Sequence, residues 1–200
     1  AFATYDATGP TLSLDSPGDN SYTNSERPTF KWKAATDAIG TISDYDLTID
    51  NPSAGSGQAS GDFTISDIPV SRTTDYETNR YVVHYDGFGD SDTGNDYISV
   101  STKSHSDWSS DQLDGKLREG KVSWKVKATD SNSNSTETSR TLFVDRTSPK
   151  VEVTQINATV YVDNLSTTDR TPTIYGKITV SLSGGDSSQT QDENGPKVAS

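Results

Sequence analysis

The stretch Lys121-Val-Ser-Trp-Lys-Val-Lys-Ala128 alternates polar and apolar residues over its whole length. Successive side chains of a β-strand point to opposite faces, so strict alternation is typical of a strand with one buried face. The stretch therefore predicts a strand that turns Val122, Trp124, Val126 and Ala128 toward a core and its lysines toward solvent.

The same alternation occurs elsewhere in the chain. It appears in Phe30–Ala34, Ser43–Asp50 and around Leu142 and Val144, and more weakly in Tyr81–Tyr85 and Tyr97–Val100. No stretch has a convincing period of 3.6 residues, and Asp107–Leu117 has room for one short helical turn. The predicted fold class is all-β.

Composition narrows the choice of architecture. Val, Ile, Leu and Phe make up 35 of the 200 residues, or 17.5%, below the roughly 20% at which highly charged chains tend to stay disordered. A large single core is therefore excluded, which leaves disorder or a thin two-layer β architecture. Nine Tyr and three Trp argue against full disorder.

The net charge of −12 disfavours nucleic acids and anionic membranes as partners and favours divalent cations. There is no Cys, which excludes disulfides, thiolate metal sites and a Cys nucleophile. No apolar run approaches the roughly 20 residues that cross a bilayer, and Ala1–Pro10 lacks the regions of a signal peptide. We expect a mature or internal piece of a protein that does not itself insert into a membrane.

An internal repeat gives the domain organisation. Asp6-Ala-Thr-Gly-Pro10 recurs as Asp145-Arg-Thr-Ser-Pro149, an offset of 139 residues, and Pro28-Thr-Phe30 recurs as Pro172-Thr-Ile174, an offset of 144 residues. Proline fixes its own φ and keeps its predecessor extended, so each D-x-T-x-P link should be a stiff connector.

On this basis we expect four parts. Residues 1–9 are the end of a preceding module and its connector, and residues 10–147 are a complete module with an insertion at about 51–116. Residues 148–182 begin a second module, and residues 183–200 form a flexible polar tail. A partial module leaves an apolar sheet face uncovered, so neighbouring modules or strand exchange between molecules should complete it.

Four stretches carry a resemblance to known modules: Ser16–Asp19 with Pro28–Trp32, Asp44–Asp50, Leu117–Asp130, and Phe143–Pro149. Together they resemble the fibronectin-III-like and Ig-like tandem modules of prokaryotic cell-surface proteins, of adhesin or S-layer type. The resemblance implies a β-sandwich of about seven strands with Trp32 and Trp124 in its core. It does not cover residues 51–116, so a special activity would lie there.

Two groups of carboxylates are candidate Ca²⁺ ligands, because this cation prefers several oxygen ligands. The first is a Gly-rich turn with Asp86, Asp90, Asp92 and Asp96, for which a solvated hairpin tip is an equally good interpretation. The second is suggested by related arrays, which often hold Ca²⁺ between domains, and consists of Asp6, Asp130 and Asp145. Simple capping of a strand end by Asp145 is the alternative.

Other candidate sites are weaker. Asn134, Asn157 and Asn164 fit the N-x-S/T glycosylation pattern, which a Ser/Thr-rich chain meets by chance. Phe88, Tyr97 and Trp108 are candidates for an aromatic platform that stacks on carbohydrate, including cell-surface glycans. No residue pattern indicates catalysis, since His84 and His105 are the two histidines and neither lies near a nucleophile pattern.

We therefore expect a non-enzymatic, extracellular segment of a cell-surface protein, which acts as a spacer, an adhesin stalk or an S-layer or filament element and self-assembles. Calcium would stiffen it by neutralising part of its charge. The alternative is a carbohydrate-binding module that uses the aromatic residues of the insertion.

Overall fold

The computed structural model describes residues 5–52, 61–89, 93–157, 159–160 and 168–179. Strands make up 52% of the structure and there is little helix, so the prediction of an all-β protein is confirmed. The chain folds into two compact units, Ala1–Arg146 and Thr147–Ser200, here called unit 1 and unit 2.

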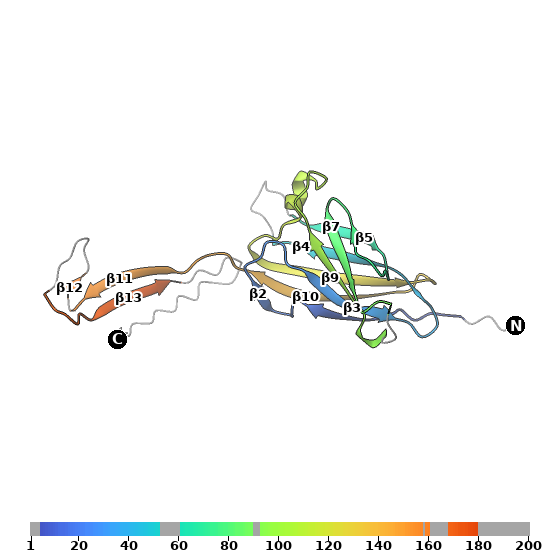
Figure 1. Cartoon of the computed structure of the whole chain (residues 1–200), viewed down its shortest axis with the longest axis horizontal. Helices are drawn as coiled ribbons and strands as arrows, with labels where there is room; N and C mark the ends of the chain where they lie inside the picture. Colours follow the sequence, from blue (N-terminus) through green and yellow to red (C-terminus); the bar gives the residue numbers. More distant parts are fainter. Residues whose placement is uncertain (1–4, 53–60, 90–92, 158, 161–167, 180–200) are drawn as a thin grey trace. The chain divides into compact units, whose positions relative to one another are not determined.

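Unit 1 contains two five-stranded sheets (Figure 1). The first has the neighbour order β1 (Thr11–Ser16), β3 (Phe30–Thr36), β8 (Tyr97–Thr102), β7 (Tyr81–Asp86), β6 (Tyr76–Glu77). The second has the order β2 (Ser21–Thr23), β10 (Ser135–Val144), β9 (Gly120–Asp130), β4 (Ile42–Asp50), β5 (Phe63–Ile68). Neighbouring strands are antiparallel except β2 and β10, which are parallel.

The core of unit 1 lies between these sheets and follows the alternation of the sequence. The four predicted inward side chains of β9 are fully buried. Phe30 of β3 packs against Trp124 with ring centroids 5.1 Å apart, and Trp32 packs against Tyr45 of β4 at 5.6 Å. Aromatic pairs across the interior thus join the two sheets, as expected for a two-layer fold that buries alternate residues.

Residues 51–116, expected as an insertion with strands at Tyr81–Tyr85 and Tyr97–Val100, contribute strands to both sheets in their described part. Their described part supplies β5 to the second sheet and β6, β7 and β8 to the first. Phe63, Ile65, Val83, Ile98 and Val100 from this segment are buried in the same core as Trp32 and Trp124. Alternation in this segment is weak because polar residues separate its few apolar ones, which lowers the periodic signal without preventing burial.

Two short 3-10 segments lie between strands, η1 (Thr93–Asn95) between β7 and β8 and η2 (Ser110–Gly115) between β8 and β9. The second falls inside the stretch expected to have a helical turn. Leu113, Asp114 and Gly115 at its end have φ values of 51°, 57° and 72°, in the left-handed region. Gly115 lies against the ring of Trp108, since a Cβ atom at this position would come within 2.6 Å of that ring.

Unit 2 contains one three-stranded antiparallel sheet with the neighbour order β12 (Thr159–Val160), β11 (Lys150–Ile156), β13 (Ile174–Thr179). The strand β11 begins directly after Pro149, as β1 begins directly after Pro10. The predicted tail at 183–200 lies outside the described residues.

Candidate functional site

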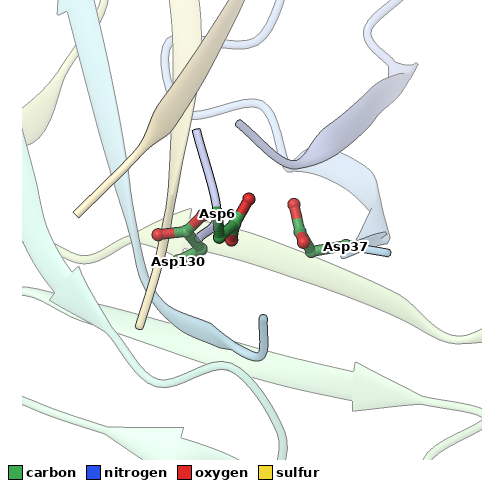
Figure 2. Close-up of side chains that lie close together, drawn as sticks. All are labelled: Asp6, Asp37 and Asp130. Atoms are coloured by element: carbon green, nitrogen blue, oxygen red, sulfur yellow. The ribbon is translucent and has the colours of Figure 1, made fainter. Parts of the chain in front are cut away.

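Three aspartates from distant parts of the sequence meet at one end of unit 1 (Figure 2). Asp6 belongs to the connector before β1, Asp37 follows β3, and Asp130 is the last residue of β9. The pairing of Thr11 with Thr36 places the start of β1 beside the end of β3. One carboxylate oxygen from each aspartate lies within 4.8 Å of the others. We call these three residues the aspartate cluster.

The tight hairpin between β9 and β10 fixes Asp130, which is only 2% exposed. Its Oδ1 accepts hydrogen bonds from the backbone N–H groups of Asn132 and Asn134, both at 2.8 Å, and its Oδ2 accepts one from the Asn134 side chain at 3.0 Å. Asp and Asn commonly stabilise turns in this way, by accepting hydrogen bonds from backbone groups two or more residues ahead. The buried carboxylate therefore organises the hairpin.

The connector is bound to this hairpin through Asp6. The Nδ2 group of Asn132 donates to Asp6 Oδ2 at 2.9 Å, and that of Asn134 donates to the Asp6 carbonyl at 3.4 Å. The other carboxylate oxygen accepts hydrogen bonds from the Thr8 N–H at 3.1 Å and the Thr8 hydroxyl at 3.0 Å. The Thr8 N–H and then the Asn132 amide hold the pKa of Asp6 below its usual value, because both favour the charged carboxylate.

Gly9 brings the connector into close contact with β10. A Cβ atom at this position would lie 2.8 Å from both the carbonyl oxygen of Ser135 and the hydroxyl oxygen of Thr136. Real Cβ atoms essentially never approach other atoms so closely, so the packing requires glycine. The connector is thus packed against the unit as well as hydrogen-bonded to it.

Asp37 completes the cluster from the loop between β3 and β4. Its Oδ1 accepts hydrogen bonds from the backbone N–H groups of Ile39 and Gly40, both at 2.9 Å. None of the ion pairs found among the described residues involves any of the three aspartates. Three carboxylates therefore lie together with neutral hydrogen-bond donors around them, and their oxygens are the kind of ligand that a hard cation prefers.

Asp145, predicted as a ligand together with Asp6 and Asp130, lies elsewhere, and that grouping is wrong. It follows Val144 at the end of β10, whereas Asp130 lies before the start of β10. Ten residues of strand, roughly 33 Å at about 3.3 Å per residue, separate the two positions. The backbone N–H of Asp145 donates to the Thr23 carbonyl at 2.9 Å, so it extends the pairing of β10 with β2.

The Gly-rich turn is described only at its two sides. Asp86 ends β7 opposite Tyr97; its side chain is 79% exposed and lies 3.8 Å from Lys31 Nζ. The Asp96 carbonyl accepts a hydrogen bond from the Ala34 N–H at 2.9 Å. Asp90 and Asp92 lie outside the described residues, so a cation site in this turn stays a prediction.

The aromatic platform does not form as expected, because Trp108 is buried. Its ring is 6% exposed and packs edge-on against Phe63 with centroids 4.9 Å apart, and its Nε1 donates to the Lys103 carbonyl at 2.8 Å. Phe88 packs against Tyr85 at 5.5 Å, and the Tyr97 ring lies under Lys31 Nζ at 4.3 Å. All three aromatic rings therefore have contacts within unit 1.

Two of the candidate glycosylation residues use their amide groups in internal hydrogen bonds. Asn134 binds both Asp6 and Asp130 through Nδ2. Asn157 donates to Asp169 at 3.2 Å and accepts from the Thr173 N–H at 2.9 Å. Modification of Asn134 would break the connector contacts, so this position is a poor glycan acceptor. Asn164 lies outside the described residues.

Asp37, Asn132 and Asn134 are site residues that sequence reasoning did not select as ligands or connector contacts. A usable signal was present, since the loops after two predicted strands, Thr36-Asp-Ala-Ile-Gly40 and Asp130-Ser-Asn-Ser-Asn134, are both rich in turn-forming residues. What was missing was the strand pairing that places both loops at the same end as the first connector.

The chain matches no protein-family model and no curated protein. Among the described residues, no helix has the length and apolar character needed to cross a membrane. Function must therefore be inferred from the geometry of the site.

Proposed function

We propose that this chain is a non-enzymatic structural segment of an extracellular surface protein, built from Ig-like modules in tandem. The strand order of unit 1 supports an Ig-like sandwich. The order β1-β3-β8-β7 corresponds to the A-B-E-D sheet of such domains, and β10-β9-β4 corresponds to G-F-C. The first two strands lie at the edges of different sheets, β1 in the first sheet and β2 in the second, and β5 adds a strand to the second sheet.

The observation that carries the proposal is the fixed connector. A module in a spacer, a stalk or a surface lattice must transmit its orientation to its neighbours, which a flexible linker does not do. Here the residues before β1 are held by two asparagine side chains of the β9–β10 hairpin and by the close approach of Gly9 to β10. Such a connector fixes the direction in which the chain enters the module.

A divalent cation, Ca²⁺ in an extracellular setting, would strengthen this arrangement at the aspartate cluster. The cluster joins the connector to two loops of unit 1, and its three carboxylates have no ion-pair partner among the described residues. A cation held between them would neutralise charge and link the three segments at once.

The alternative, a carbohydrate-binding module, has less support. Its central residue, Trp108, fills the space between Phe63 and Gly115 and offers no open face for a sugar ring. Stacking on a sugar requires an exposed aromatic face, which Phe88 and Tyr97 provide only in part because both are half-buried.

Thermal melting of the full chain at neutral pH with Ca²⁺ and with EDTA tests the cation. A ligand that binds only the folded state stabilises it by about 2.7 kcal/mol at a concentration of 100 times its Kd. For a unit of this size, at about 3 °C per kcal/mol, this corresponds to a rise in Tm of about 8 °C. We expect this rise for unit 1 in the native chain.

The matched variants are Asp37→Asn, inside the cluster, and Asp15→Asn, an exposed aspartate of β1 with the same change of charge. Asp37→Asn should remove most of the Ca²⁺-dependent rise, and Asp15→Asn should leave it unchanged. Equal melting temperatures with Ca²⁺ and with EDTA, or an equal Ca²⁺-dependent rise in Tm in both variants, would remove the cation from the proposal.

A further inference from the structure

The first strand pair of each unit has the same register from Ser13 of β1 and Glu152 of β11 onward. In unit 1, Leu14 of β1 lies opposite Trp32 of β3, and Ser16 lies opposite Lys31, with an irregularity between them. In unit 2, Val153 of β11 lies opposite Gly176 of β13, and Gln155 lies opposite Tyr175, again with an irregularity between them. The repeat offsets of 139 and 144 residues carry each member of the first set onto its counterpart in the second. The two pairs are therefore equivalent over this part, including the irregularity after Leu14 and Val153, whereas β1 has a second irregularity, between Thr11 and Ser13, that β11 lacks.

One face of the β11–β13 pair is apolar. Residues directly opposite in an antiparallel pair share a face, and so do alternate residues of a strand. The pairing of Val151 with Ile178 and of Val153 with Gly176 therefore places these residues on one face, together with Ile174. The other face carries the pair Glu152 and Lys177. The strand pair is amphipathic, as a sheet that covers a core should be.

The equivalent faces differ sharply in exposure. Leu14 and Phe30 of unit 1 are 5% and 1% exposed, because the second sheet covers them. Their counterparts in unit 2, Val153 and Ile174, are 38% and 46% exposed. Val151 and Ile178 are still more exposed, at 68% and 50%. The face that is buried in the core of unit 1 is therefore exposed in the described part of unit 2.

We propose that this face is a docking surface for a second β-sheet, whose inner face carries alternating large apolar residues like those of β4 and β9. Unit 1 provides the template, since there the equivalent pair is covered by Trp124 of β9 and Tyr45 of β4. The proposal rests on the proposed function, in that it treats both units as modules of one type.

Size and composition argue against two other occupants. A stable interface buries roughly 800 Å² per partner from about 20–30 residues, whereas a symmetric pair of β11–β13 faces would bring together only a few aliphatic side chains from each copy. The last 21 residues of the chain, 180–200, have three large apolar residues, Val180, Leu182 and Val198. Neither a second copy nor this segment provides a complete apolar sheet.

Gly176 specifies the shape of the partner. It stands where unit 1 has Trp32, so the middle of the docking surface lacks a side chain. Interiors are close-packed, and the missing volume must come from the covering sheet. The partner should therefore place a large side chain over Gly176, at least as large as the Tyr45 that covers Trp32.

The test supplies such a sheet from the chain itself. A fusion in which residues 1–179 are followed by a second copy of residues 36–145 places the strands that follow β3 after β13. Amide hydrogen exchange is then measured at Val151, Val153 and Ile178 in the native chain and in the fusion. We expect protection to rise by at least about 100-fold in the fusion, since covered core strands open only through large-scale unfolding. The amides of β1 and β3 serve as the internal standard.

Three substitutions in the fusion make the result decisive. The sheet of unit 1 is shaped for Trp32, so the fusion is also made with Gly176→Trp. In whichever fusion is protected, Val153→Asp on the docking surface should abolish protection and Glu152→Gln on the opposite face should not. Absence of protection in both fusions would overturn the proposal. Strong protection in the native chain together with a dimer in sedimentation would also overturn it, by identifying a second copy as the occupant. The thermal melts with Ca²⁺ report on unit 1 and the hydrogen exchange reports on unit 2, so the proposed function and the docking surface can be refuted separately.

Discussion

Replacement of Gly9 by alanine should destabilise unit 1, because this residue allows the connector to lie against β10. The new methyl group would lie 2.8 Å from the backbone carbonyl oxygen of Ser135 and from the Thr136 hydroxyl, and the carbonyl belongs to a strand that cannot easily move. Forcing extra volume into a packed site costs about 1–3 kcal/mol. At about 3 °C per kcal/mol, the expected fall in Tm is about 3–9 °C.

The control is Gly18→Ala in the same unit. A Cβ atom at this position would meet only the Ser21 Cβ, at 3.8 Å, which is an ordinary contact. Both variants reduce the entropy of the unfolded chain in the same way, so the difference between their melting temperatures reports the packing of the connector. Thermal melts followed by near-UV circular dichroism measure this difference. Equal melting temperatures for the two variants would refute the close packing of Gly9.

Three further changes test other parts of unit 1. Asp130→Ala leaves the N–H groups of Asn132 and Asn134 without their acceptor and should lower the free energy of unfolding in urea by about 2–4 kcal/mol. Asp130→Asn keeps one acceptor oxygen and should lower it by less than half as much. Equal losses in the two variants would contradict this role of Asp130. Burial raises the pKa of Tyr45 to about 12, so its contribution to stability, roughly 3 kcal/mol, is present below pH 10 and is lost as the pH rises from about 10 through 12. Urea unfolding across that range should show the loss in the native chain and a smaller one in Tyr45→Phe, and a flat profile would contradict the burial. Trp108→Ala should lower the stability by about 3–5 kcal/mol through loss of core packing, and a fully stable variant would show that the ring is dispensable to the fold.

The strands of the core could be predicted where alternation is regular and their side chains are large. The stretch around Trp124 specifies its own buried face, and the structure buries each predicted residue of that face. The segment 51–116 gave a weaker signal, because its strands interleave Val and Ile with Asp, His and Ser, and their burial depends on pairing with β3 and β4. Tertiary pairing, which has no local sequence signal, decided the outcome there.

The candidate site could be predicted only in part, because its assembly also depends on strand pairing that has no local sequence signal. Asp6 and Asp130 were expected as ligands from the resemblance to arrays that hold Ca²⁺ between domains, and their carboxylates lie close together in the structure. Asp37 joins them only because β1 pairs with β3 and β4 pairs with β9, which brings the two loops to the connector. Asp145 looked equivalent to Asp6 by its link, yet it belongs to the opposite end of β10. Trp108 looked exposed because it lies in a polar loop, but the left-handed turn at Gly115 folds that loop over it.

The proposed structural role depends most on the rigidity of the first connector. Backbone ¹⁵N relaxation of Asp6, Ala7, Thr8 and Gly9 in the native chain measures it directly, on the picosecond to nanosecond timescale. We expect order parameters of about 0.85, equal to those of β9 and β10, because the connector is hydrogen-bonded and packed against unit 1. Order parameters below about 0.6 at these residues would mean that the connector moves freely, which would contradict a role in fixing the direction of the chain.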